Sequence, residues 1–181
     1  MALELWNVDP AHSSVTFTVR HMVVSKVRGR FGKWTAILGL DAADLSKSTV
    51  EVSIEAASID TGVGDRDAHL KSPDFFDAAK FPALGFKSKK VAVKSGTALE
   101  VTGDLTMHGV SKEIVLAVEH GPLGKDPWGN QRSGFSAHAA INRKDWGLGW
   151  NQVLEAGGLL VSEKVEIELE LQAIKPAAKP A

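Results

Sequence analysis

The sequence predicts an all-β protein, an antiparallel β-barrel of about eight strands with one or two short helices near residues 65–78. Apolar and polar residues alternate strictly in several segments, and between residues 165 and 171 apolar side chains and glutamates fall on opposite faces, as in a half-buried strand. Turn residues such as Lys94-Ser95-Gly96 and His108-Gly109 separate most of these segments. Because little of the chain has a helical pattern, the sheet must cover its apolar face by closing on itself or by packing on a second sheet.

The strand pattern begins close to the N-terminus. Val15, Phe17 and Val19 alternate with threonines, and His21 continues their inward register. The same period of two recurs along the chain, for example at Val50, Val52 and Ile54. The predicted strands are residues 14–20, 30–40, 48–56, 81–93, 97–107, 112–120, 134–142 and 161–171.

One region has helix signals. Residues 65–71 can form one or two turns. Ser72-Pro73-Asp74 then carries an N-cap, a proline at the first helical position and an acid in the first turn. Phe75 and Phe76 follow at once, so this second short helix is expected to lie over one end of the barrel as a lid or a plug.

Composition excludes several classes of function. The chain has no cysteine, so disulfides, thiolate metal sites and cysteine nucleophiles are absent. Its six histidines are never fewer than nine positions apart, which removes local zinc signatures, and no metal or cofactor is expected. A net charge of −1 with scattered cations argues against nucleic acid as a partner.

Three further expectations concern membrane association, localisation and the extent of the folded domain. No apolar run is long enough to span a bilayer, so no integral membrane association is expected. The first residues lack a signal-peptide pattern, which predicts a cytoplasmic protein, or a periplasmic one if a leader has been removed. Residues 1–174 are expected to form one barrel domain, and the low-complexity residues 175–181 a disordered tail.

The sequence contains no complete catalytic motif of the common classes. Residues 62–67 begin like a dinucleotide fingerprint but lack its third glycine, and residues 134–138 lack the last glycine of a nucleophile elbow. The prediction is therefore that the protein is not an enzyme. Two alternatives stay open. One is an enzyme acting on a lipid or quinone, with His21 as acid or base, and the other is a fully packed barrel serving as an interaction domain.

Aromatic residues near glycine-bearing segments suggest an apolar cavity. Trp146-Gly147-Leu148-Gly149-Trp150 places two indoles around small residues, and Trp34 follows Phe31 closely. A structural core would explain any one of them. Together they suit a small-molecule site with few polar anchors, and eight strands make about the smallest barrel that can hold one ligand.

At the level of motifs the chain resembles the YceI-like family. The resemblance covers residues 6–173 and rests on motifs found in order: Asp9-Pro10-Ala11-His12-Ser13, Arg20-His21-Met22, Val27-Arg28-Gly29-Arg30-Phe31, Ala57-Ser58-Ile59-Asp60-Thr61-Gly62, residues 66–77, Phe81-Pro82, residues 103–110, Asp126-Pro127-Trp128-Gly129 and residues 141–148. It implies a bacterial, lipocalin-like barrel filled by a polyisoprenoid or similar long-chain lipid, and often a homodimer. Many relatives carry an export leader, a feature missing from the start of this chain.

The predicted function is binding of a long-chain amphiphile, such as a polyisoprenoid or an isoprenoid quinone, for carriage, storage or stress protection. His21, Arg66, His69 and Arg143 are the candidate contacts for a polar head group, because arginine suits phosphate or carboxylate. The alternative for the two arginines is a structural salt bridge with Asp67 or Asp145. The residues predicted to line or close the tube are Phe17, Val19, Phe31, Trp34, Val52, Ile54, Leu70, Phe75, Phe76, Phe135, Ile141, Trp146 and Trp150.

Overall fold

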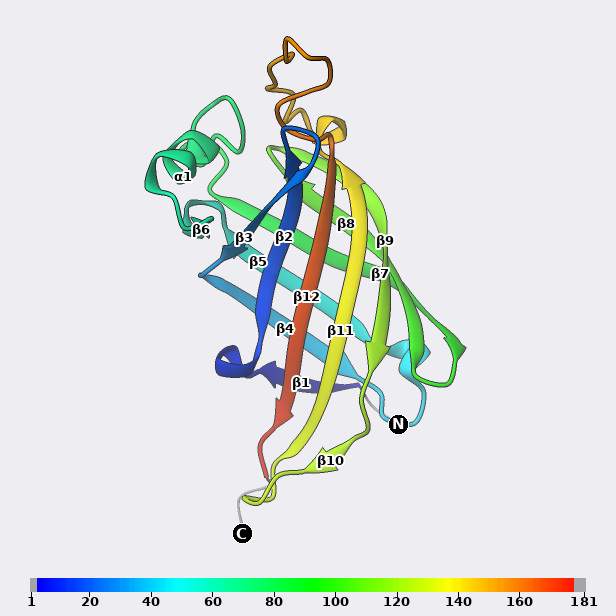
Figure 1. The fold of residues 1–181 in the computed structure, drawn as a ribbon. Coiled ribbons are helices and arrows are strands. Elements are labelled where there is room, and N and C mark those ends of the chain that lie inside the picture. Colours follow the sequence, from blue (N-terminus) through cyan, green and yellow to red (C-terminus); the bar gives the residue numbers. More distant parts are fainter. Residues whose placement is uncertain (1–2, 178–181) are drawn as a thin grey trace.

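The computed structural model describes residues 3–177, and their strands form one closed antiparallel barrel (Figure 1). The ring runs β11–β9–β8–β7–β5–β4–β1–β12 and closes where β12 pairs with β11. The predicted eight-strand barrel is confirmed. Its elements are β1 (Glu4–Val8), η1 (Pro10–His12), β2 (Ser14–His21), β3 (Ser25–Phe31), β4 (Trp34–Leu40), η2 (Leu45–Lys47), β5 (Thr49–Glu55), η3 (Ala56–Ser58), β6 (Ile59–Asp60), α1 (Gly64–Lys71), β7 (Ala83–Ser95), β8 (Ala98–Met107), β9 (Val110–His120), β10 (Gly124–Lys125), β11 (Gln131–Asn142), η4 (Arg143–Trp146) and β12 (Lys164–Lys175).

Three positions of the ring are occupied by a strand that breaks and continues. β1 and β2 both pair with β12, on either side of η1, while β3 continues β4 and pairs with β2. β6 continues β5 in the same way and pairs with β3. The single strand predicted for residues 30–40 is therefore wrong. It is interrupted because the Gly32 amide bonds to Ser58 and the Lys33 carbonyl accepts from Glu55, outside the regular ladder.

Alternation decides which side chains enter the barrel. On β8, Leu99, Val101, Leu105 and Met107 are buried, while on β12 the glutamates face outward. β8 and β9 meet at a two-residue turn, His108-Gly109, in which both residues have positive φ (53° and 72°). That is the geometry of a tight hairpin turn whose twist matches its strands, and glycine at its second position adopts it without strain.

The predicted helix at residues 65–71 is confirmed as α1, but the second helix predicted from Ser72 is wrong. Residues 73–76 form turns instead. The Phe76 amide bonds to the Leu70 carbonyl and the Ala78 amide to the Lys71 carbonyl. These amides fold the chain back onto the end of α1 and so cannot extend a new helix. The reversal carries Phe75 and Phe76 over one end of the barrel.

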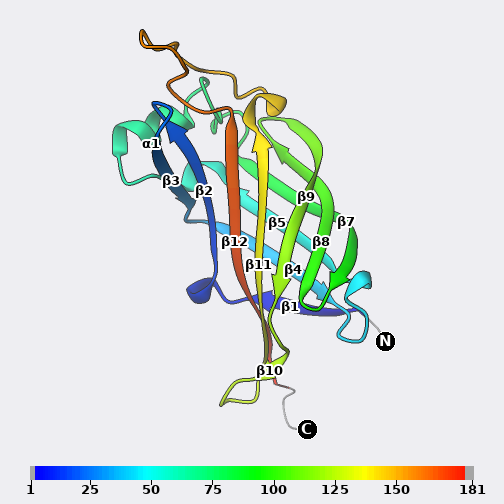
Figure 2. The same cartoon turned by 45° about the vertical axis from the view of Figure 1, so that its right-hand side comes forward.

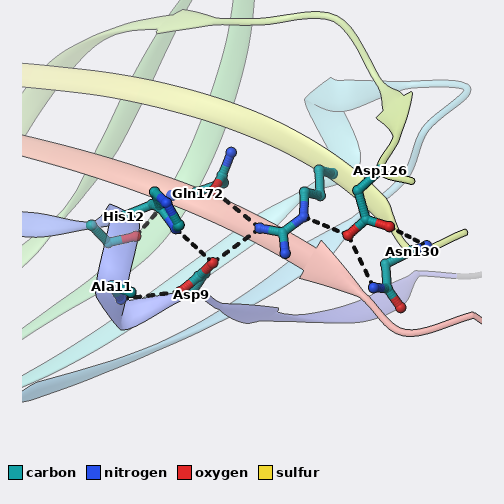
Figure 3. Close-up of polar contacts among 8 residues, drawn as sticks. Asp9, Ala11, His12, Asp126, Asn130 and Gln172 are labelled. Carbon is teal, nitrogen blue, oxygen red and sulfur yellow. Dashed lines mark hydrogen bonds and ion pairs between the residues drawn. The ribbon is translucent and has the colours of Figure 1, made fainter. Parts of the chain in front are cut away.

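A partly buried ion-pair network joins three segments at the opposite end of the barrel (Figure 3). Arg132 on β11 donates to Asp9 at 3.0 Å and to Asp126 at 2.8 Å, and its Nη1 also donates to the Gln172 side chain on β12 at 3.1 Å. The Asp126 side chain is only 6% exposed. Arg132 thus ties the N-terminal segment, the β10–β11 loop and the closing strand together.

The network predicts acid sensitivity. Arg132 holds the pKa of both Asp9 and Asp126 at about 2, against the ordinary 3.8. Because the folded pKa values are lowered, the stabilisation is complete above about pH 4 and is lost as the pH falls through about 2. We expect Arg132→Met to lower the thermal midpoint at neutral pH, and this difference from wild type to narrow between about pH 4 and pH 2. Thermal melts across this range test it, with the exposed Lys33→Met as control. A difference in thermal midpoint between wild type and Arg132→Met that stays constant down to about pH 2 contradicts the prediction.

The last strand of the barrel extends into the segment predicted to be the tail. Lys175, predicted to begin the tail, is the last residue of β12, and its Nζ lies 2.7 Å from a Glu4 carboxylate oxygen. The Ala177 amide bonds to the Asn130 side chain. Residues 178–181, the rest of the predicted tail, lie outside the described residues. Within residues 3–177 no helix is both long and apolar enough to cross a membrane.

Candidate functional site: an apolar tube in the barrel

The barrel encloses two adjoining apolar cavities. The upper one, beneath α1 and the β2–β3 turn, has a volume of about 430 Å³, and the lower one about 120 Å³. Val15, Ile54, Leu105 and Ile167 line both, so the two cavities adjoin at these four side chains. We call the cavities the upper and lower compartments of the tube, and the four side chains its waist. A narrow, apolar, elongated space of this kind suits a long hydrocarbon chain.

The lower compartment is almost entirely hydrocarbon-lined. Of the predicted residues, Val52, Ile54 and Phe135 lie in its wall. The prediction named none of the other residues of this wall. Most of them occupy inward positions of predicted strands, so the alternation itself could have found them. These are Leu38, Leu40, Val50, Phe86, Val91, Leu99, Val101, Leu116, Val118, Ala137, Leu169 and Leu171.

Aromatic rings form one wall of the upper compartment. The rings of Phe17 and Phe31 lie 5.7 Å apart, and Phe76 meets Phe31 edge-on at 5.9 Å. Phe17 can take this place because the residue opposite it in the ladder is Gly29. A Cβ on Gly29 would overlap the Phe17 ring, so the glycine makes room for the aromatic wall.

A second aromatic cluster closes the mouth. His69 on α1 lies edge-on to Trp150 at 4.7 Å and to Phe75 at 5.1 Å. Its Nε2 is 2.8 Å from a carboxylate oxygen of Asp74, in the turn that follows the helix. The ring orientation of His69 is thereby held, with an apolar side toward the tube and a polar partner toward solvent.

Arg143 places a buried cation beside this cluster. Its side chain donates to the backbone carbonyls of Ser162 at 2.9 Å and Leu148 at 2.6 Å, and the residue is 4% exposed. Within residues 3–177 no carboxylate forms an ion pair with it, so the predicted alternative of a salt bridge with Asp145 is wrong. Burial lowers the pKa of Arg143, but the guanidinium stays protonated because its ordinary pKa is so high. The guanidinium carbon also lies 5.8 Å from the centre of the Phe75 ring.

The other two predicted polar contacts also reach the upper compartment. Arg66 lines it and donates to the Thr61 hydroxyl at 2.7 Å and to the Thr61 carbonyl at 2.9 Å. The alternative of a salt bridge with Asp67 is wrong, since Asp67 accepts from Thr61 instead. His21 lines the wall at the top of β2, where it bridges to Val161.

Two tryptophans of the predicted set do not line the tube. Trp146 is buried and donates its indole N–H to the Leu105 carbonyl at 2.9 Å, so it forms part of the barrel wall behind the cavity. Trp34 packs against the buried cluster outside both compartments. The structure brings the other fifteen together in the tube wall: Phe17, Val19, His21, Phe31, Val52, Ile54, Arg66, His69, Leu70, Phe75, Phe76, Phe135, Ile141, Arg143 and Trp150.

Comparison with known proteins identifies related sequences and a matching family. A YceI-like domain model matches residues 6–173. A UPF0312 protein of Vibrio cholerae is 39% identical over 165 residues, covering 91% of this chain and 83% of the relative. A UPF0312 protein of Shewanella denitrificans is 38% identical over the same length and shares of the two chains.

Solved structures agree with this placement. The fold is similar to that of BcnA from Burkholderia cenocepacia, with a TM-score of 0.81 and 25% identity over 92% of this chain and 99% of that one. A YceI protein of Campylobacter jejuni gives a TM-score of 0.77 and 31% identity over 87% of this chain and 90% of that one. With a family match over nearly the whole sequence and the same closed barrel in its relatives, this chain belongs to the YceI-like family.

Proposed function

We propose that the protein binds one long-chain amphiphile, a polyisoprenoid, an isoprenoid quinone or a similar lipid, inside the barrel. The observation that carries the proposal is the tube itself, two adjoining compartments lined mainly by apolar side chains, with the charged ones confined to the upper compartment. Dehydrating the chain contributes about 0.8 kcal/mol per buried methylene-equivalent before entropic costs. A long tail therefore needs few polar contacts, and the lining offers few.

The polar end of such a lipid belongs at the mouth. His21, Arg66, His69 and Arg143 all line the upper compartment, while the lower one contains no charged residue. Arg143 has no carboxylate partner among the described residues, which favours an acidic or strongly hydrogen-bonding head group there. The tail then extends past the waist toward the lower end.

A structural neighbour supports the ligand class only through its fold. A domain from Saccharophagus degradans, described as a polyisoprenoid binding domain, has a TM-score of 0.70 over 96% of this chain and 99% of that one, but only 19% identity. The roles of carriage, storage or stress protection, and the homodimer, stay predictions. The cavities argue against the alternative of a fully packed barrel.

Lipid extraction from natively purified protein, followed by mass spectrometry, tests the proposal. We expect wild type to carry a long-chain lipid, and Phe76→Asp to reduce its occupancy on the order of tenfold, because the variant places a charge in the apolar wall. Val115→Asp, which changes an exposed apolar residue on β9, serves as the matched control. The absence of lipid from wild type, or equal lipid in a folded Phe76→Asp protein, contradicts the proposal.

The same preparations separate binding from catalysis. His21→Ala removes the group that an enzyme acting on lipid or quinone would use as acid or base. A binding protein should keep most of its lipid in this variant, and the lipid should be chemically unchanged in both. Conversion of the bound lipid by wild type but not by His21→Ala would support the enzyme instead.

A further inference from the structure

The turn between β2 and β3 has an unusual sequence for its shape. Met22 and Val23 both have positive φ, 49° and 69°, a conformation that favours asparagine and glycine and strains a β-branched residue. The β8–β9 turn of this chain, with the same two signs of φ, is made by His108-Gly109. Met22 and Val23 are therefore not the residue types that favour positive φ in a turn.

These residues also expose apolar surface. Met22, Val23 and Val24 are 55%, 57% and 76% exposed, so three successive apolar side chains stand at the tip of a hairpin. Strain and apolar exposure in the same residues both oppose stability and solubility. Features that break local rules in this way are expected at functional segments.

The apolar tip stands on the rim of the tube. The Met22 amide bonds to the Leu160 carbonyl, and His21, which lines the upper compartment, bridges to Val161. The loop of residues 151–161 adds Val153, 77% exposed. Figures 1 and 2 show this loop and the β2–β3 turn at the same end of the barrel, opposite β10.

A group of cations, Arg20, Lys26 and Arg28, lies next to the tip on β2 and β3, and we call it the basic collar. The segment from residue 14 to residue 31 contains four cations and no acid. Arg20 and Lys26 face each other across the ladder, a pairing of like charges that weakens a sheet. Within the described residues Arg20, Lys26 and Arg28 form no ion pair. The nearest acid in register on β12 is Glu166, which lies opposite Thr18 in the same row of the sheet as Arg28. Arg20 and Lys26 lie closer to the tip than this acid.

We propose that the β2–β3 tip docks the mouth of the tube onto the surface of a bilayer that contains anionic lipid. An apolar wedge enters the interface, and a basic collar meets the acidic head groups, which are the two signals that reversible membrane binding needs. The docked mouth, which the aromatic cluster around His69 closes in this structure, then faces the membrane directly. The purpose of the contact rests on the proposed function, because a lipid passing between bilayer and tube avoids water.

Vesicle flotation tests the docking. We expect wild type to bind vesicles of phosphatidylglycerol and phosphatidylethanolamine, to bind less as salt rises, and to bind phosphatidylcholine vesicles weakly. The double variant Met22→Asn with Val23→Gly should lower binding on the order of tenfold. It should leave the thermal midpoint unchanged or raise it, because both new residues suit positive φ. Lys26→Gln with Arg28→Gln should lower binding to the anionic vesicles by a similar factor and flatten its salt dependence.

Controls keep the outcomes separate. Trp128→Ser changes a side chain that is 78% exposed at the β10 end of the barrel and should bind vesicles as wild type does. Absence of vesicle binding by wild type, equal binding by the tip variant, or equal loss in Trp128→Ser overturns the docking. A change from dimer to monomer in the tip variant assigns the tip to self-association and also overturns it. Lipid extracted from the same samples separates the two proposals: lipid-loaded protein without vesicle binding refutes only the docking, and protein without lipid refutes the proposed function.

Discussion

Ala137→Phe is expected to shorten the tube and to abolish tight binding of long chains while short chains still bind. Ala137 lies on β11 in the wall of the lower compartment, whose volume is only about 120 Å³. A phenyl ring there occupies the space that the end of a long tail would fill. Excluding about four methylene-equivalents weakens binding by about 3 kcal/mol, on the order of a hundredfold.

Competition binding with a long and a short polyprenol measures this effect. The short prenol fits in the upper compartment and should bind wild type and variant alike. Ala140→Phe is the matched control, because Ala140 lies on the same strand but is exposed. If Ala137→Phe proves unstable, Ala137→Leu tests the same point with a smaller side chain. If folded Ala137→Phe and wild type bind the long prenol with equal affinity, the tail does not reach the lower compartment.

Arg143→Met is expected to destabilise the protein by about 3 kcal/mol, because hydrogen bonds to a charged donor are among the stronger ones and their loss leaves carbonyl groups unpaired. The carbonyls concerned belong to Leu148, Val161 and Ser162, in the segment between η4 and β12. For a chain of this length the thermal midpoint should fall by about 10 °C. Hydrogen exchange should accelerate first in this segment.

Lys144→Met provides the comparison for Arg143→Met. Lys144 is the next residue and pairs with Glu163 at 3.2 Å, but both side chains are largely exposed, so its loss should change stability little. Urea or thermal unfolding measures the stability of both variants relative to wild type. Equal stability of Arg143→Met and wild type would mean that the carbonyls find other donors and that the arginine does not organise the mouth.

Alternation predicts the barrel well because one face of each strand is buried. In residues 48–56 and 97–107 a shift of one position would expose every apolar side chain, so the pattern has only one stable register. β1 escapes prediction because it is short and contributes a single fully buried side chain, Trp6. Ser25–Gly29 of β3 escapes because its inward positions include a glycine, which gives no apolar signal.

The parts of the site that could not be predicted depend on contacts between distant segments. The cap signals at Ser72 are genuine local preferences, but the amides of Phe76 and Ala78 return to α1, and tertiary context overrides propensity. For Arg143, the nearby Asp145 in the sequence suggests a salt bridge. Its actual partners are backbone carbonyls in an irregular loop, and no residue type marks them in the sequence.

The pairing of β12 has a consequence for how the protein is made. This last strand is the neighbour of β11 on one side and of both β1 and β2 on the other. Until it leaves the ribosome, the nascent chain has two open sheet edges and an uncovered apolar inner face. Non-local pairings of this kind form slowly and leave the chain open to aggregation. Chaperone demand should therefore last until β12 has been synthesised, and a chain truncated ahead of Lys164 should be a substrate for proteases.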